Sequence, residues 1–182
     1  MKKCNDPADE ELDLVRFDEM IRRELFVESI VPHDLNVWLS LITEKGFQEL
    51  LQDHISMMEV YHSVFTFTSL CNDFEEMEHD DPDKHRAIIS ELSGYSDWKR
   101  RVNAREGNSY LQETLQYIDP ATNKMECYEE DLRGLVRLVL NYFERAETWG
   151  TFALIVGQNF PNLLSDLQEK MFKAGYYVPR QV

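Results

Sequence analysis

The apolar residues between positions 128 and 145 recur every third or fourth residue, which predicts an amphipathic helix with one buried stripe. A second face of this helix carries one polar residue on each successive turn, namely Arg133, Arg137, Asn141 and Arg145. Such a face can hold a phosphate backbone. It can equally be a solvated helix surface, because charged residues opposite an apolar stripe are the ordinary pattern.

Similar spacing predicts helices along most of the N-terminal half. An acidic start leads into a helix that ends near Ser29, and Pro32 interrupts the chain soon afterwards. From about residue 36 to residue 71 we expect one long helix or two shorter ones. Residues 75–83 are so acidic that the sequence predicts a solvated linker there.

The C-terminal half reads as shorter helices separated by turn residues. Pro82 opens a helix that reaches about residue 92, and a second short helix covers residues 109–118. Residues 146–160 are treated as a connection. Pro161 then begins the last helix, and Gly175 is placed to end it as the first residue beyond the cap.

Composition supports an all-α fold. The chain has only seven glycines and six prolines, which favours long helices over hairpins, and its 182 residues are enough for one sizeable core. We therefore expect one compact multi-helix domain with an N-terminal helical arm. The expected boundaries are an acidic arm and helix over 1–30, the domain over 31–176, and a tail over 177–182.

The net charge of −15 narrows the possible partners. Most non-specific nucleic-acid affinity comes from phosphate neutralisation, so an acidic chain does not bind DNA or RNA indiscriminately. Any contact with RNA would be confined to a local basic site. The same charge disfavours docking on an anionic membrane, and it suits a basic protein partner.

The cysteines and the N-terminus point to an intracellular protein. Three widely spaced cysteines imply neither a disulfide framework nor a metal site, so a reducing compartment is the default. The start of the chain lacks the apolar segment of a signal peptide, and no stretch of eighteen apolar residues predicts a membrane span. We expect a soluble protein of the cytoplasm or nucleus.

Familiar catalytic motifs are missing from the sequence. There is no glycine-rich phosphate-binding loop, and the kinase signatures Asp-Phe-Gly and His-Arg-Asp are both missing. The five histidines do not form a zinc motif, and the acidic run at 75–83 lacks the ligand order of a calcium loop. The sequence therefore predicts no cofactor and no metal.

One short segment combines an aromatic residue with several cations. Trp98 is followed by Lys99, Arg100 and Arg101, and together with Arg133 these residues are our candidates for contacting RNA. A tryptophan beside cations can stack a base and hold phosphates. The alternative is a tryptophan that anchors its helix in the core while its neighbours face solvent.

Five short segments stand in a definite order along the chain. They are His33 with Trp38, residues 50–56, Asp97-Trp98, residues 135–141 and residues 160–164. Together they resemble the KEN domain, the all-α ribonuclease module that follows the kinase in the unfolded-protein-response sensor and in ribonuclease L. The resemblance begins with His33 and Trp38, which are similar to the entry of that module, and extends to about Phe172.

The resemblance implies metal-independent RNA cleavage, in which a histidine and a tyrosine move protons while arginine and asparagine hold the scissile phosphate. Asn141 matches the family asparagine, and Tyr128 lies within about a residue of the family tyrosine. Leu140 stands where the phosphate arginine belongs, and Arg145 stands where the histidine belongs. Arginine stays protonated and cannot pass a proton, so Arg137 and Arg145 can supply only positive charge.

The resulting hypothesis is a stand-alone KEN-like domain with weakened or lost ribonuclease activity, linked to RNA processing or stress signalling. Its catalytic-site candidates are Asn141, Tyr128, Arg137 and Arg145, and its partners are structured RNA, a KEN-containing protein or a second copy of the chain. A different hypothesis is an acidic helical module that regulates a true KEN nuclease without RNA chemistry. An unrelated helical domain is the third.

Overall fold

The structure is a computed structural model that describes residues 7–26, 30–104, 109–119, 123–146 and 148–177. Its chain divides into two compact units, one within residues 1–58 and the other from Glu59 to Tyr177. The sequence predicts a boundary near residue 30, and the structure divides its two units between Met58 and Glu59. The candidate site residues all lie in the second unit.

The first unit is built from short helices. Its elements are α1 (Pro7–Met20), a π-helical turn (Ile21–Leu25), α2 (His33–Ile42), α3 (Gln48–Gln52) and a 3₁₀ turn (Ile55–Met57). Trp38 on α2 donates from Nε1 to the Leu51 carbonyl at 2.9 Å and meets the Phe17 ring edge-on, so it links α1, α2 and α3.

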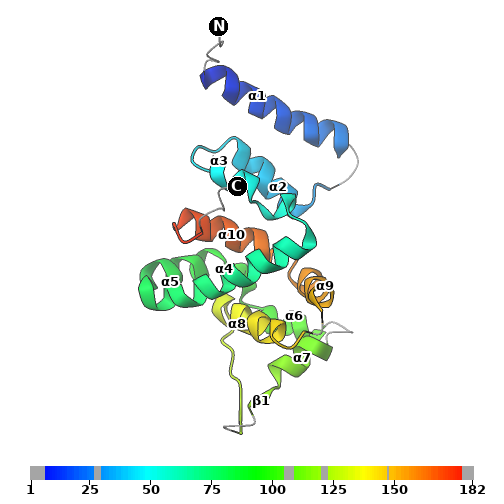
Figure 1. The fold of residues 1–182 in the computed structure, drawn as a ribbon, viewed down its shortest axis with the longest axis vertical. Coiled ribbons are helices and arrows are strands. Elements are labelled where there is room, and N and C mark those ends of the chain that lie inside the picture. Colours follow the sequence, from blue (N-terminus) through cyan, green and yellow to red (C-terminus); the bar gives the residue numbers. More distant parts are fainter. Residues whose placement is uncertain (1–6, 27–29, 105–108, 120–122, 147, 178–182) are drawn as a thin grey trace. The chain divides into compact units, whose positions relative to one another are not determined.

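The second unit contains the longest helix and the main core. Its elements are α4 (Val60–Asp80), α5 (Pro82–Glu91), a 3₁₀ turn (Ser93–Tyr95), α6 (Trp98–Ala104), α7 (Ser109–Leu115), β1 (Ile118–Asp119), β2 (Lys124–Met125), α8 (Leu132–Phe143), α9 (Trp149–Asn159) and α10 (Leu163–Lys173). Helix α4 packs against α5, α8, α9 and α10, and α8 also packs against α7 (Figure 1). The core beneath them holds fully buried Phe74, Trp98, Phe152 and Phe160.

Side-chain caps explain where several of these helices begin. The Asp81 carboxylate accepts from the Lys84 backbone N–H, and Pro82 occupies the first turn of α5. Asp131 and Thr148 cap α8 and α9 in the same way. Each cap satisfies a backbone donor that the first turn of a helix leaves open.

The prediction of an all-α protein is confirmed in its main feature. Within the described residues the only sheet is a two-residue hairpin, in which Ile118 pairs with Met125 and Asp119 with Lys124. Asn123 in its turn has φ 54°, a left-handed conformation that asparagine tolerates better than most residues. Among the described segments, no helix combines the length and apolar character needed to cross a bilayer.

Three local predictions were wrong. Residues 36–71 do not form one or two helices, because the chain turns at Gly46 (φ 97°) and again before α4. The acidic run at 75–83 is not a linker: α4 continues to Asp80, and Asp81 caps the next helix without an intervening loop. The presumed connection at 146–160 contains α9, an eleven-residue helix.

Candidate functional site

The polar face of α8 does not form one continuous stripe, because each of its residues contacts a different partner. Arg133 pairs with Glu78 of α4 at 2.8 Å, and Arg137 pairs with Glu126 at 3.0 Å. Asn141 donates instead to the hydroxyl of Tyr128. The two arginines are therefore neutralised by carboxylates within the chain.

Tyr128 and Asn141 form the centre of the candidate site. The Asn141 amide Nδ2 lies 2.9 Å from the Tyr128 hydroxyl, although the tyrosine precedes α8 and is not part of it. The predicted start of this helix at Tyr128 is wrong. Asp131 caps the helix, and Leu132 is its first residue. The residues before the cap bring the phenol back against the last turn of the helix.

Contacts from α6 hold the segment that carries Tyr128. Lys99 donates from Nζ to the Tyr128 carbonyl, and Trp98 donates from Nε1 to the Glu129 carbonyl at 3.2 Å. The Trp98 ring also meets the Tyr128 ring edge-on, with centroids 6.3 Å apart. Gly134 makes this approach possible, since a Cβ at that position would lie 2.0 Å from the Glu129 carbonyl oxygen.

The surroundings of Tyr128 keep its hydroxyl protonated at neutral pH. Burial raises the pKa of Tyr128 above its ordinary value near 10, while the hydrogen bond from Asn141 opposes that rise. The carboxylate of Glu126 also raises the pKa, and the positive charges of Arg145 and Arg137 lower it. The other three catalytic-site candidates, Asn141, Arg137 and Arg145, thus all act on this phenol, which is a poor base at neutral pH.

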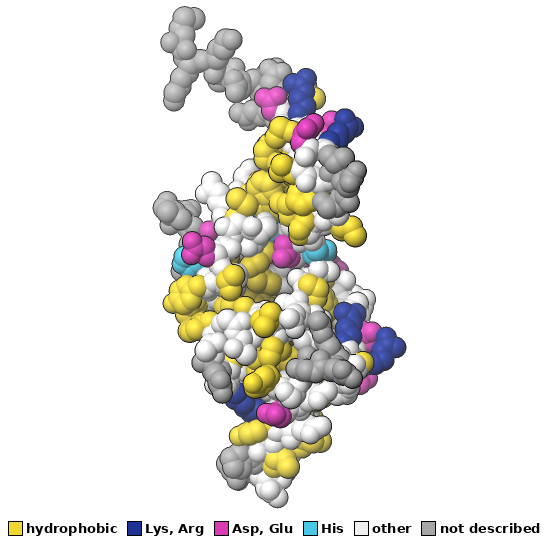
Figure 2. Space-filling view, turned by 90° about the vertical axis from the view of Figure 1, so that its right-hand side faces the viewer, with side chains coloured by type: hydrophobic (Ala, Val, Ile, Leu, Met, Phe, Trp, Pro, Cys, Tyr) yellow, Lys and Arg dark blue, Asp and Glu magenta, His cyan; other side chains and the backbone are white. Residues whose placement is uncertain are grey.

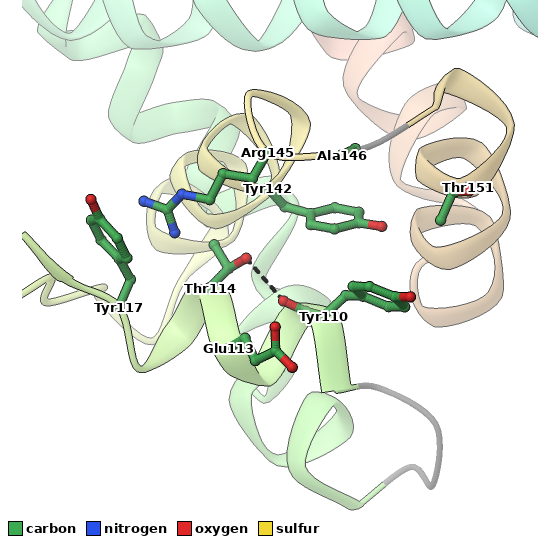
Figure 3. A pocket seen from close by; sticks show the side chains of 8 residues that line it. All are labelled: Tyr110, Glu113, Thr114, Tyr117, Tyr142, Arg145, Ala146 and Thr151. Atoms are coloured by element: carbon green, nitrogen blue, oxygen red, sulfur yellow. Dashed lines mark hydrogen bonds between the residues drawn. The ribbon is translucent and has the colours of Figure 1, made fainter.

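Arg145 lies at a cavity of about 370 Å³ (Figure 3). It comes directly after Glu144, the cap residue at the end of α8, and its guanidinium carbon is 3.6 Å from the centroid of the Tyr117 ring. This is a close cation–π contact. Among the described residues Arg145 makes no ion pair with a carboxylate, which distinguishes it from Arg133 and Arg137. The other residues that line the cavity are Tyr110, Glu113, Thr114, Tyr142, Ala146 and Thr151.

The cavity adjoins the Tyr128–Asn141 pair but does not include it. Helix α7 and the end of α8 supply two walls, and Thr151 of α9 completes the lining (Figure 3). Within α7, Thr114 donates to the Tyr110 carbonyl at 2.9 Å. Arg145 belongs to both places, since it lines the cavity and also acts on the Tyr128 pKa. The resulting site combines one exposed cation, one carboxylate (Glu113), one amide, one protonated phenol and several aromatic rings.

The expected RNA-contacting cluster around Trp98 has a different role. Trp98 is fully buried, so it anchors α6 in the core and offers no face for a base. Arg100 and Arg101 both pair with Asp97 at 2.8 Å, and these contacts hold the pKa of that carboxyl below its ordinary value. Lys99 is engaged by the Tyr128 carbonyl. The alternative that the sequence offered, a core tryptophan with outward-facing neighbours, describes this segment.

Burial shifts the pKa values of two further side chains, Glu75 and His85. Burial raises the pKa of Glu75, and the charges of Arg133 and Arg137 only partly offset this. His85 is buried against the Phe74 ring, with centroids 4.4 Å apart, and burial lowers its pKa. Within the described part of the chain, no group of three or more His, Cys, Asp or Glu side chains is placed to hold a metal ion.

Sequence reasoning missed the aromatic half of the site. Tyr110, Tyr117 and Tyr142 line the cavity, but they belong to three different segments and share no motif. It also missed Glu78 and Glu126, the carboxylates that neutralise Arg133 and Arg137. The only sequence signal was the general excess of acidic over basic residues.

No protein-family model matches the chain, and comparisons with curated proteins and with solved structures give no significant match.

Proposed function

We propose that the chain contains a KEN-like domain over about residues 31–176, and that this domain contacts RNA at Asn141, Arg145 and the Tyr128 hydroxyl without cleaving it. The observation that supports this proposal is the 2.9 Å hydrogen bond between Tyr128 and Asn141. The family resemblance singles out these two positions independently of any structure. They come from different elements, and helical spacing alone does not bring them together.

The chemistry of the site supports binding better than cleavage. Cleavage at a ribose hydroxyl needs a group that gains and loses a proton near neutral pH. The Tyr128 pKa is raised, and Arg145 is permanently protonated. None of the groups that act on Tyr128 is a histidine. A phosphate oxygen could therefore accept hydrogen bonds here, but neither Tyr128 nor Arg145 would exchange protons with the substrate.

The charge distribution limits this contact to a small area. Arg100, Arg101, Arg133 and Arg137 are all paired with carboxylates, whereas Arg145 rests on an aromatic ring. A phosphate could approach Arg145 without breaking an ion pair among the described residues. The site would then engage one or two phosphates of an exposed loop rather than a long duplex.

The test is binding of a fluorescent stem-loop RNA in EDTA at several salt concentrations. We expect Arg145→Gln to weaken binding and to reduce the slope of log K against log salt by about 1, because one phosphate contact is lost. Arg86→Gln is the matched control, since Arg86 pairs with Asp83 on α5 and does not line the cavity. Equal effects of the two variants would reject the proposed contact.

The same samples test for cleavage. We expect the RNA to stay intact in EDTA over hours. Cleavage in EDTA that Asn141→Ala abolishes would overturn the inactive version of the proposal, and cleavage that requires added metal would count against the family chemistry.

A second candidate function is an acidic protein-interaction module without RNA contact. The observation that favours it is that Arg100, Arg101, Arg133 and Arg137 are all paired with carboxylates in a chain of net charge −15. No salt-sensitive RNA binding by the wild-type protein would favour this module over the first proposal.

A further inference from the structure

A row of contacting aromatic side chains extends from the core of the second unit to its surface. We define the aromatic surface as Tyr61 and Phe65 of α4, Phe143 at the end of α8, and Trp149 at the start of α9. Trp149 lies 4.2 Å from Phe65, 5.4 Å from Phe143 and 5.6 Å from Tyr61, measured between ring centroids. The rings are thus in mutual contact.

These rings are large and unusually exposed for a contiguous group. Tyr61 is 53% exposed, Trp149 41% and Phe65 37%. Isolated apolar side chains on a surface need no explanation, but a joined cluster of aromatic rings marks an interaction site. Figure 2 views the side of the molecule on which α9 lies, and hydrophobic side chains reach the surface there.

The inner end of the cluster is anchored rigidly. Phe143 meets Phe152 edge-on at 5.1 Å, and Phe152 is 1% exposed. A hollow of about 300 Å³ opens beside Trp149, and its lining includes Phe143, Phe152 and Glu144. A hollow of this size accepts a single apolar side chain, which is how anchor residues engage protein interfaces.

The charge around the aromatic surface specifies the partner. Helices α4 and α9 contain no lysine and no arginine. Glu59 comes directly before α4, and Glu144 lines the hollow, so two negative charges border the aromatic surface. A second copy of this chain also carries a net charge of −15, which opposes self-association.

We propose that the aromatic surface binds an amphipathic helix of another protein, with apolar anchors flanked by lysine or arginine. One anchor fills the hollow beside Trp149, and a second packs on Tyr61 and Phe65. The basic flanks face Glu59 and Glu144. This interaction does not use Tyr128, Asn141 or Arg145, so it stands or falls independently of RNA contact.

The test uses three synthetic helical peptides of about 18 residues, long enough for five turns. One carries Leu and Phe at positions i, i+3, i+4 and i+7 with lysines on its flanks. The second replaces those lysines with glutamates, and the third keeps the lysines but scrambles the apolar positions. Fluorescence anisotropy of labelled peptide measures binding to the full chain.

We expect the first peptide to bind and each of the other two to bind at least about tenfold more weakly, which corresponds to the loss of one good contact. Trp149→Ala and Tyr61→Ala should each weaken binding of the first peptide by about tenfold. Tyr110→Ala is the matched control, because Tyr110 is 47% exposed but lines the other cavity, and we expect it to bind normally. Thermal melts establish that each variant is folded. If Trp149→Ala does not fold, Tyr61→Ala tests the proposal in its place.

Three outcomes would overturn the proposal. One is equal binding of the lysine and glutamate peptides, and another is binding of the first peptide that both aromatic variants leave unchanged. The third is concentration-dependent dimerisation in sedimentation that Trp149→Ala abolishes, which would assign the aromatic surface to a second copy.

Discussion

The polar face of α8 and the aromatic surface differ in how their groups are satisfied. On α8, Arg133 and Arg137 are paired with carboxylates of the same chain, and Asn141 is paired with a phenol. On the aromatic surface, Trp149 and Tyr61 keep roughly half of their area exposed to solvent. The charged residues stand out in the sequence, yet the structure leaves exposed aromatic area on the apolar side.

The difference shows that a charged stripe is a poor guide to binding unless the partners of its charges are known. An ion pair within the chain must be broken, at some cost, before an arginine can serve a ligand. An exposed aromatic ring requires no such exchange, and its burial is favourable from the start. Arg145 is the exception on the polar side, since it rests on Tyr117.

Alanine substitutions at Trp98 and Trp149 should give the largest difference in stability between the buried core and the aromatic surface. We expect Trp98→Ala to lower the free energy of unfolding by about 3–5 kcal/mol, because the side chain is fully buried and its indole holds the Glu129 carbonyl. Trp149→Ala should cost no more than about 1 kcal/mol, since that ring is substantially exposed. Urea titrations of both variants measure the difference, and similar costs would contradict the division into a core and an open surface.

A pair of glycines tests whether the segment before α8 is held as closely as described. In Gly134→Ala the new Cβ would meet the Glu129 backbone, so we expect a loss of about 1–3 kcal/mol in unfolding free energy. Gly157 on α9 is the matched control, because a Cβ there meets nothing within 4 Å. Gly157→Ala should stabilise the protein by about 0.5–1 kcal/mol through improved helix propensity. If thermal or urea unfolding shows that both substitutions change the free energy of unfolding in the same direction, Gly134 does not lie as close to the Glu129 backbone as described.

The central hydrogen bond of the polar side can be removed with little change in volume. We expect Tyr128→Phe to reduce the free energy of unfolding by about 1 kcal/mol, because Asn141 loses its acceptor in a half-buried setting. Tyr61→Phe on the aromatic surface should change stability by less than about 0.5 kcal/mol. If urea unfolding places the two variants at the same midpoint, the Tyr128–Asn141 bond contributes nothing measurable.

The smallest effect concerns Glu75, which lies near Arg133 and Arg137. Burial raises its pKa above the ordinary value of 4.5, so the folded protein favours the protonated form. Stability is therefore lost as the pH rises from the unfolded pKa through the folded one, and Glu75→Gln should recover it at pH 7. We expect a gain of about 0.5 kcal/mol, allowing for partial solvent screening.

That gain should vanish below about pH 4, where the carboxyl is protonated in both states. Glu76→Gln is the control, since Glu76 is exposed on the same helix and the substitution removes the same charge. Unfolding measured from pH 4 to pH 7 separates the two. A loss of stability in Glu75→Gln at pH 7 would mean that the attraction to the arginines outweighs burial.

The parts of the fold that sequence could predict rest on local signals. Asp81 and Pro82 fix the start of α5, and Gly175, with φ 77°, follows the end of α10 as predicted. The apolar spacing of α8 also identified a helix whose buried face lies in the core. Each of these signals lies within a few residues of its effect.

The rest depended on contacts between distant segments. The acidic run at 75–83 looked like a linker because sequence does not show that Arg133, more than fifty positions later, pairs with Glu78. Trp98 looked like a stacking platform because nothing local shows that it is buried. The aromatic surface was invisible for the same reason, as its four rings come from three helix ends that meet only in the fold.

The most direct measurement for the proposed RNA contact is an NMR titration of the full chain with a stem-loop RNA. The account predicts that the side-chain signals of Asn141 and Arg145 shift first and that Arg86 signals stay unchanged. Shifts confined to other surfaces, or no shifts at RNA concentrations that give binding by anisotropy, would contradict it.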